Sequence, residues 1–226
     1  ERYAAVNQMD EHGQTPLFFA AAKGHEAVVG RLLAAGAVVD GLDEDVFTPL
    51  DMAATEGHDA VVAALLAAGA VVQADVLHKA AENGHEAVVD LLVAKGVDVN
   101  TVNKSGKMPL HLAAENGHTA VVDRLITEGA DVKKSDNNWE KPLQLAFSKG
   151  HMEVVAALLA AGADFIIKGG IDADKQKQHY LDILNAAAKK GYAKVVLILI
   201  RKLKRVGMSV PEAYNQADKT GMTPLF

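Results

Sequence analysis

Apolar residues recur along this chain in short blocks with helical spacing, and glycines separate the blocks. In the block over residues 25–35, four apolar residues follow an i, i+1, i+4, i+5 pattern, namely Val28, Val29, Leu32 and Leu33. This pattern predicts a helix with one buried stripe. Gly36 follows the block and suits the end of that helix, because glycine readily adopts the left-handed conformation common there.

A shorter helix is predicted just before each of these blocks. Thr15 is a favourable N-cap residue, and Pro16 fits the first helical position, where a missing N–H has no cost. Leu17 and the alanines after it form a short apolar face, and Gly24 suits the helix end. The pattern therefore predicts pairs of short helices, joined by extended connections that contain a turn.

The helix pairs repeat along the sequence. A Gly-His dipeptide recurs at spacings of 33, 27, 33 and 33 residues: Gly24-His25, Gly57-His58, Gly84-His85, Gly117-His118 and Gly150-His151. A Thr-Pro-Leu-like tripeptide lies nine residues before four of these: Thr15-Pro16-Leu17, Thr48-Pro49-Leu50, Met108-Pro109-Leu110 and Lys141-Pro142-Leu143. Helices of about ten residues are marginal alone, so neighbouring pairs must stack to bury their stripes. This predicts an elongated repeat protein.

The segment from Met108 to Ala114 reads Met-Pro-Leu-His-Leu-Ala-Ala, and residues 97–100 read Val-Asp-Val-Asn. With these motifs the sequence resembles the ankyrin repeat family over nearly its whole length. The resemblance implies an all-α repeat solenoid of stacked antiparallel helix pairs, with a β-hairpin loop projecting from each repeat. We call these projecting loops fingers and number them by repeat.

The repeats place one solenoid across residues 1–226, with about six full repeats and partial repeats at both ends. The expected units are 10–42, 43–74, 75–102, 103–135, 136–181 with an inserted loop at 166–180, 182–216, and a partial unit at 217–226. Because both ends match incomplete repeats, we expect the chain to be a fragment of a longer protein.

Departures from the repeat pattern point to special sites. The third unit is six residues short near Ala74, which predicts a stunted finger and a notch between the second and fourth fingers. Trp139 stands at the turn position that Gly106 occupies in the fourth unit, and Val46 followed by Phe47 stands there in the second. A large aromatic side chain on a projecting turn is typical of an interface anchor, whereas local packing is the alternative.

Composition narrows the possible functions. The net charge of −6 disfavours nucleic-acid binding, which needs a basic surface. The chain has no cysteine, which rules out thiolate chemistry, and it carries no G-x-S-x-G, P-loop or H-E-x-x-H motif. We therefore expect no enzyme activity, no metal and no cofactor. Five histidines share one repeat position, where spacing by a repeat is too wide for shared metal ligation, so we expect them to make hydrogen bonds at helix starts.

The sequence therefore predicts a protein–protein interaction module, monomeric and cytoplasmic, that binds a protein partner along its concave finger and first-helix surface. The expected contact residues are Trp139, Phe47, Glu44, Asp45, Glu56, Glu82, Asn83, Lys104, Lys107, Glu115, Asn116, Asn137, Asn138, Glu140 and Lys149. An alternative is the targeting or regulatory arm of a larger enzyme whose catalytic domain lies outside this chain. Membrane association is not favoured, although the basic run over residues 201–205 offers it as a weaker third interpretation.

Overall fold

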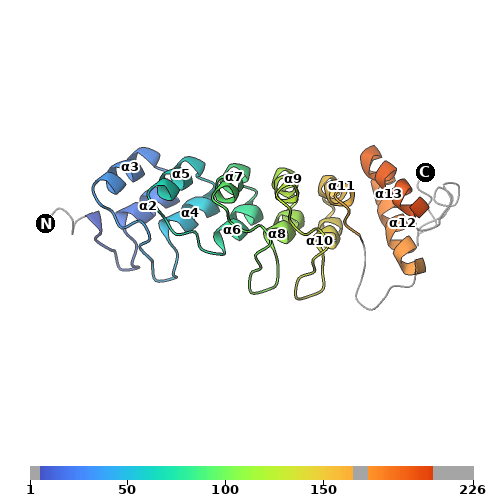
Figure 1. The fold of residues 1–226 in the computed structure, drawn as a ribbon, viewed down its shortest axis with the longest axis horizontal. Helices are drawn as coiled ribbons and strands as arrows, with labels where there is room; N and C mark the ends of the chain where they lie inside the picture. Colours follow the sequence, from blue (N-terminus) through green and yellow to red (C-terminus); the bar gives the residue numbers. More distant parts are fainter. Residues whose placement is uncertain (1–5, 165–172, 206–226) are drawn as a thin grey trace.

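The computed structural model describes the backbone of residues 6–164 and 173–205. Over these residues the chain forms six helix pairs that follow one another in an elongated row (Figure 1). The pairs are α2 (Pro16–Ala22) with α3 (Glu26–Ala34), α4 (Pro49–Glu56) with α5 (Asp59–Ala67), α6 (Val76–Asn83) with α7 (Glu86–Ala94), α8 (Pro109–Asn116) with α9 (Thr119–Thr127), α10 (Pro142–Lys149) with α11 (Met152–Ala160), and α12 (Ala173–Lys189) with α13 (Ala193–Arg205). The predicted solenoid of stacked helix pairs is confirmed.

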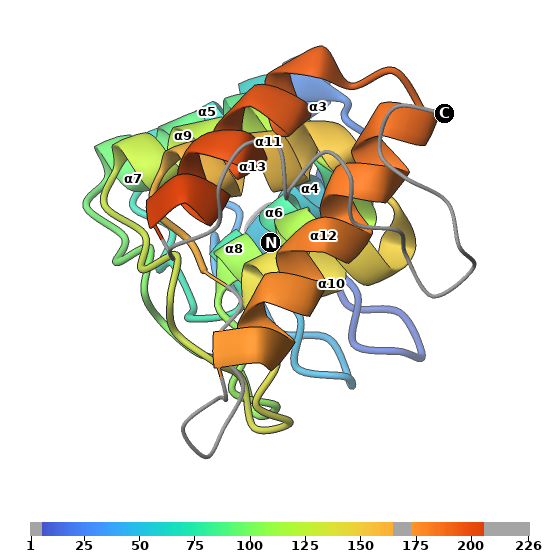
Figure 2. The same ribbon diagram turned by 90° about the vertical axis from the view of Figure 1, so that its right-hand side faces the viewer.

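The helices form two layers. The first helices of successive pairs pack against one another from α2 to α10, and the second helices do so from α3 through α11 to α13. Seen along the row, the first helices lie beneath the second helices, and the fingers extend beyond the first helices (Figure 2). One continuous apolar core runs between the layers, from Leu17 in the first pair to Leu203 in the last.

The predicted apolar stripes form this core in α5, α7 and α9, whereas in α3 of the first pair Val29 is buried but Val28 is 46% exposed. In α7, Val88, Val89 and Leu92 are fully buried, and the equivalent residues of α5 and α9 are buried as well. Neither layer has a hydrophobic interior of its own, so each helix depends on its neighbours for burial.

Local sequence sets the helix ends. Thr48 and Asp51 form a reciprocal capping box at the start of α4, in which the Asp51 amide donates to the Thr48 hydroxyl over 3.1 Å and the Thr48 amide donates to the Asp51 carboxylate over 2.7 Å. Gly57 ends the same helix in a left-handed conformation, with φ of 78°. The helix boundaries expected from Thr-Pro-Leu and Gly-His are therefore present.

The fingers differ from the expected β-hairpins in one respect. Among the described residues the chain contains no β-strand, and each finger is a loop closed by a tight turn. In finger 4, for example, the Asn103 amide donates to the Lys107 carbonyl and the Gly106 amide to the Asn103 carbonyl. These bonds close the tip but do not continue as the ladder that defines a strand pair.

The third repeat has no finger. Fourteen residues (35–48) join α3 to α4 and fourteen (95–108) join α7 to α8, whereas only eight (68–75) join α5 to α6. Figure 1 shows the resulting gap beneath α6, between the fingers that precede α4 and α8. The predicted notch is confirmed.

The sixth repeat departs from the expected inserted loop over residues 166–180. Residues 173–180 belong to α12, which is 17 residues long, whereas the first helices of the other pairs have seven or eight. Lysine, glutamine and alanine in this polar run favour helix, so the insertion lengthens the helix. Residues 166–172 of that loop, and the partial repeat expected at 217–226, lie outside the described residues.

Candidate functional site

At the tip of each described finger, one side-chain oxygen accepts hydrogen bonds from two backbone amides. In finger 2 the Asp43 carboxylate accepts hydrogen bonds from the amides of Asp45 and Phe47, over 3.1 and 2.8 Å. Asp10, Asn103 and Asp136 do the same in fingers 1, 4 and 5. Side-chain oxygens of Asp and Asn suit such turns because they replace backbone acceptors. In finger 1, the amide of Gln14 helps to hold the pKa of Asp10 below its ordinary value.

The fourth residue of each tip has a left-handed backbone. Gly13 and Gly106 occupy it in fingers 1 and 4, but Val46 and Trp139 occupy it in fingers 2 and 5, with φ of 67° and 65°. This conformation costs a residue with a Cβ about 1–2 kcal/mol relative to glycine. Both side chains are more than half exposed, so two large apolar groups project from the tips at a cost in stability.

Phe47 does not project as expected. Its side chain is half-buried, and the Lys79 ammonium of α6 lies 5.2 Å from the ring centroid. A cation over an aromatic face is attracted by the negative potential of the ring. Phe47 therefore packs on the next repeat, and Val46 is the apolar residue that finger 2 presents to solvent.

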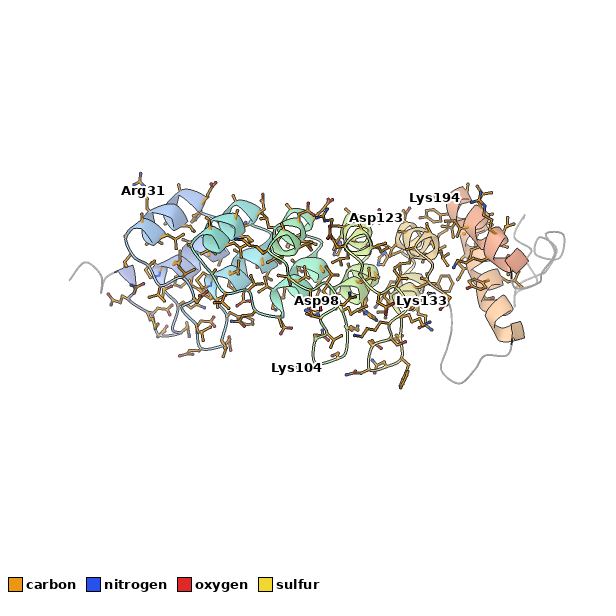
Figure 3. All side chains as sticks on the ribbon, viewed as in Figure 1. Arg31, Asp98, Lys104, Asp123, Lys133 and Lys194 are labelled. Carbon is orange, nitrogen blue, oxygen red and sulfur yellow. The ribbon has the colours of Figure 1, made fainter. Side chains whose placement is uncertain are left out.

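The other expected contact residues spread over one surface of fingers and first helices. On the tips, the exposed members are Glu44, Asp45, Lys104, Asn137 and Asn138; on the first helices they are Glu56, Glu82, Asn83, Asn116 and Lys149. Figure 3 shows Lys104 at the end of finger 4. Lys107 and Glu115 are half-buried and form an ion pair with each other, and Glu140 is half-buried at the base of finger 5. The surface is thus polar and varied above a uniform core.

The fingers are paired by backbone hydrogen bonds. The Glu44 amide of finger 2 donates to the His12 carbonyl of finger 1 over 3.0 Å, and the Asn137 amide of finger 5 donates to the Ser105 carbonyl of finger 4 over 3.1 Å. The Asn137 side chain adds a bond to the Lys104 carbonyl. Fingers 1 and 2 therefore form one unit, fingers 4 and 5 form another, and the notch separates them.

A hollow of about 250 Å³ lies in the notch. Its walls come from α6, α8 and finger 4: Asp75, His78, Lys79, Glu82, Asn103, Lys104, Ser105 and Leu112. Buried His78 fixes the floor, because its ring nitrogens lie 3.0 Å from the Ala74 carbonyl and 3.1 Å from the Lys107 carbonyl. The shortened connection has therefore left a defined polar hollow with a rigid base.

The model for ankyrin repeats, in three copies, matches residues 3–75 and 77–169 of the chain. The chain belongs to the ankyrin repeat family. The break at residue 76 falls in the repeat without a finger, and the match ends before α12. A comparison with curated proteins returned no match. Ankyrin repeats are in general protein–protein interaction modules, and the fingers and first helices described above are this chain's version of that architecture.

The histidines of the ankyrin repeats link one repeat to the next. Their Nε2 atoms lie against carbonyl oxygens at the end of the preceding repeat's first helix: His58 to Ala22 (3.2 Å), His85 to Thr55 (2.8 Å), His118 to Glu82 (2.9 Å) and His151 to Glu115 (3.1 Å). The expected bonds to their own helix starts are absent. Terminal helix carbonyls have no partner within the helix, so these rings satisfy them from outside.

His111 directly follows the Met108-Pro109-Leu110 tripeptide and is fully buried. Its Nδ1 accepts a hydrogen bond of 3.2 Å from the Met108 amide, so the neutral ring carries its proton on Nε2. Burial lowers the pKa of His111 to about 4, and the carboxylate of Asp136 acts in the opposite direction. The ring is therefore a neutral structural group at pH 7.

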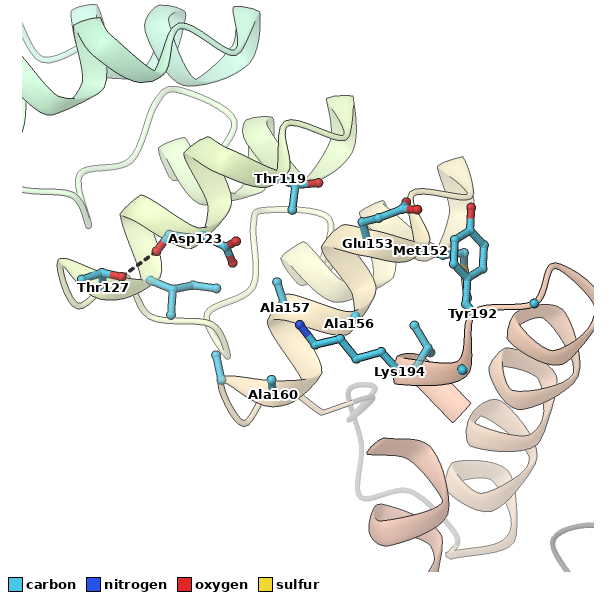
Figure 4. Close-up of a pocket in the computed structure, with 15 residues that line it drawn as sticks. Thr119, Asp123, Thr127, Met152, Glu153, Ala156, Ala157, Ala160, Tyr192 and Lys194 are labelled. Carbon is cyan, nitrogen blue, oxygen red and sulfur yellow. Dashed lines mark hydrogen bonds between the residues drawn. The ribbon is translucent and has the colours of Figure 1, made fainter. Parts of the chain in front are cut away.

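A second hollow was not predicted from the sequence. A hollow of about 720 Å³ lies on the layer of second helices, between α9, α11 and α13. Figure 4 shows Lys194 extending from α13 toward the alanines of α11, with Asp123 on α9 opposite. The four small side chains of Ala156, Ala157, Ala160 and Ala161 leave this space. The hollow also has a wall from α13 and the residues just before it, including Tyr192 and Lys194.

The basic run of α13 is partly committed to the fold. Lys202 donates a hydrogen bond of 2.7 Å from its ammonium group to the Ala163 carbonyl, while Arg201 is exposed. Within the described residues, no helix is long and apolar enough to cross a membrane. In the same part of the chain, no cluster of three or more His, Asp or Glu side chains is arranged to hold a metal ion.

Proposed function

We propose that this chain recognises a protein partner through its fingers and the exposed face of its first helices. The observation that carries the proposal is the apolar side chain on the tips of fingers 2 and 5. Val46 and Trp139 occupy left-handed positions where glycine would be more stable. They are exposed to water, which neither side chain favours. Contact with a partner accounts for both features.

The surface around the tips supports specific recognition. Finger 2 is acidic at Glu44 and Asp45, and finger 4 presents Lys104. Opposite charges along one face select the orientation of a partner and disfavour wrong ones. The repeated core behind it holds the tips in fixed register, which lowers the entropy lost on binding.

The test is capture of partners by the full chain and by its Trp139→Gly variant. Glycine removes the indole and relieves the left-handed backbone, so the variant stays folded. We expect the affinity for the captured protein to fall about thirtyfold or more, as for an interface hot spot. Leu197→Ala on α13, an exposed residue on the other helix layer, is the matched control and should bind as the wild type does. Unchanged affinity of Trp139→Gly would overturn the proposal.

A further inference from the structure

We infer that the notch is a docking site for an extended segment of the partner protein, which takes the place of the missing third finger. The inference rests on the proposed function and adds to it the position and the chemistry of one contact. The notch is bounded by Asp45 of finger 2, by α6, and by Lys104 of finger 4. It follows from four features of the described residues.

The first feature is the register of the finger pairs. We count each tip from its Asp or Asn. In both pairs, the second residue of the later tip donates its amide hydrogen to the carbonyl of the third residue of the earlier tip. These bonds are Glu44 to His12 and Asn137 to Ser105. The equivalent groups at the notch are the amide of Lys104 and the carbonyl of Asp45. Neither of these two groups has a hydrogen-bond partner among the described residues.

The second feature is that both residues lie at the surface. Asp45 and Lys104 are exposed residues at their tips. They face the gap where a finger of the third repeat would lie, as fingers do in repeats 1, 2, 4 and 5. A segment that offers an amide to Asp45 and a carbonyl to Lys104 would continue the row of tips from finger 1 to finger 5. As in strand addition, backbone bonds would give affinity and side chains selectivity, although here each neighbouring tip offers a single backbone group.

The third feature is the hollow beneath the gap. Its volume of about 250 Å³ is below the range of about 300–1,000 Å³ typical of small-molecule pockets, and charged and polar side chains form most of its wall. It is therefore suited to one side chain of a bound segment. Leu112 supplies an apolar contact at its base, and Lys79, held over Phe47, forms the rim toward finger 2.

The fourth feature is the charge of the two walls. Finger 2 presents Asp45 to the notch, because the carboxylates of Asp43 and Glu44 contact Gln14 and His12 of finger 1. Finger 4 presents Lys104, and the nearby Lys107 is already paired with Glu115. The net charge of −6 disfavours nucleic acid as the occupant. The occupant that fits is a peptide segment with a basic side chain toward Asp45 and an acidic side chain toward Lys104. The third repeat lacks six residues, so a segment of about this length fills the gap.

Restoring the finger tests the site directly. The variant carries a copy of residues 101–106 inserted between Gln73 and Ala74, which gives the third repeat a finger of ordinary length. The probe is a displayed library of random short peptides, selected on the full chain. We expect selected peptides that carry both charges and that bind the insertion variant about tenfold or more weakly. No enrichment over an unrelated protein, or equal binding to both chains, would overturn the inference.

A pair of point variants tests the backbone bond without an insertion. Lys104 is the second residue of its turn and has negative φ, a position that proline tolerates. Lys104→Pro removes the amide hydrogen and the charge, and Lys104→Ala removes only the charge. We expect the selected peptides to bind Lys104→Pro about tenfold more weakly than Lys104→Ala. Equal affinities would show that the amide is not used.

Glu11→Pro is the matched control, because Glu11 holds the same tip position in finger 1, away from the notch, and its amide likewise has no backbone hydrogen-bond partner among the described residues. It should leave peptide binding unchanged. The affinity of the captured partner for the Trp139→Gly and insertion variants then distinguishes the two proposals. If it loses affinity for Trp139→Gly but binds the insertion variant normally, the notch is excluded as a docking site while the proposed function stands.

Discussion

The imidazole of His85 donates a hydrogen bond of 2.8 Å from Nε2 to the carbonyl oxygen of Thr55, in the last turn of α4 in the preceding repeat. The ring also lies directly against Gly57, where an added Cβ would meet Nδ1 at 2.5 Å. The glycine of one Gly-His pair therefore packs against the histidine of the next pair, and this contact is repeated along the solenoid. This contact explains why the two residue types recur together at fixed spacing.

Loss of one such histidine should weaken the stack. His85→Ala removes the inter-repeat hydrogen bond and leaves a helix carbonyl with poor solvation, so we expect the free energy of unfolding to fall by about 1–3 kcal/mol. His25 holds the same position in the first pair, is exposed, and makes no such side-chain bond to a described residue. His25→Ala should change stability by less than about 0.5 kcal/mol. Urea denaturation of both variants measures the difference, and equal losses would contradict the assigned role.

The glycine side of the contact gives a second matched pair. Gly57 and Gly96 both have left-handed backbones, with φ of 78° and 83°. An added Cβ meets the His85 ring at Gly57 but nothing within 4 Å at Gly96. Gly96→Ala should cost only the conformational term of about 1–2 kcal/mol. Gly57→Ala should cost about 1–3 kcal/mol more, because the ring must move and its hydrogen bond is lost. Thermal or chemical denaturation that ranks the two equally would contradict this account.

The sequence predicted what depends on local pattern. Helix pairs follow from apolar spacing and from capping residues such as Thr48, and the notch follows from the number of residues before α6. The contacts between repeats were not predictable in the same way. The histidine partners lie about one repeat away, so no local rule assigns them. Val46 and Phe47 are adjacent, and only the position of Lys79 on the next repeat decides which of them faces water.

A pH dependence follows from His111. Its pKa is lowered from 6.5 to about 4 by burial, so folding favours the neutral ring. The associated stability is fully present above pH 6.5 and is lost as the pH falls toward 4, because the unfolded chain binds the proton first. A pKa difference of about 2.5 corresponds to a loss of at most roughly 3 kcal/mol.

The His111→Gln variant isolates this effect. Gln144 already fills the equivalent position in the fifth repeat, where its side-chain oxygen accepts a hydrogen bond of 2.8 Å from the Lys141 amide. Glutamine does not titrate, so the wild type should lose stability relative to the variant between pH 6.5 and 4. The other eight histidines are common to both chains and cancel in the comparison. Parallel curves from chemical denaturation across this range would contradict the assignment.

The tip of finger 2 allows a test of the cost attributed to its side chain. Val46→Gly relieves a left-handed backbone in a β-branched residue, and the lost side chain is mostly exposed. We expect the free energy of unfolding to rise by about 1 kcal/mol. Asp45→Gly, one position earlier and with negative φ, should instead lower it by about 0.5–1 kcal/mol, because glycine gains freedom in the unfolded chain. If partner affinity falls in Val46→Gly while its stability rises, the two quantities are opposed at this residue, as expected where a side chain is kept for binding. A fall in stability would show instead that Val46 contributes to folding, and the case for finger 2 as a contact would then rest on its charges alone.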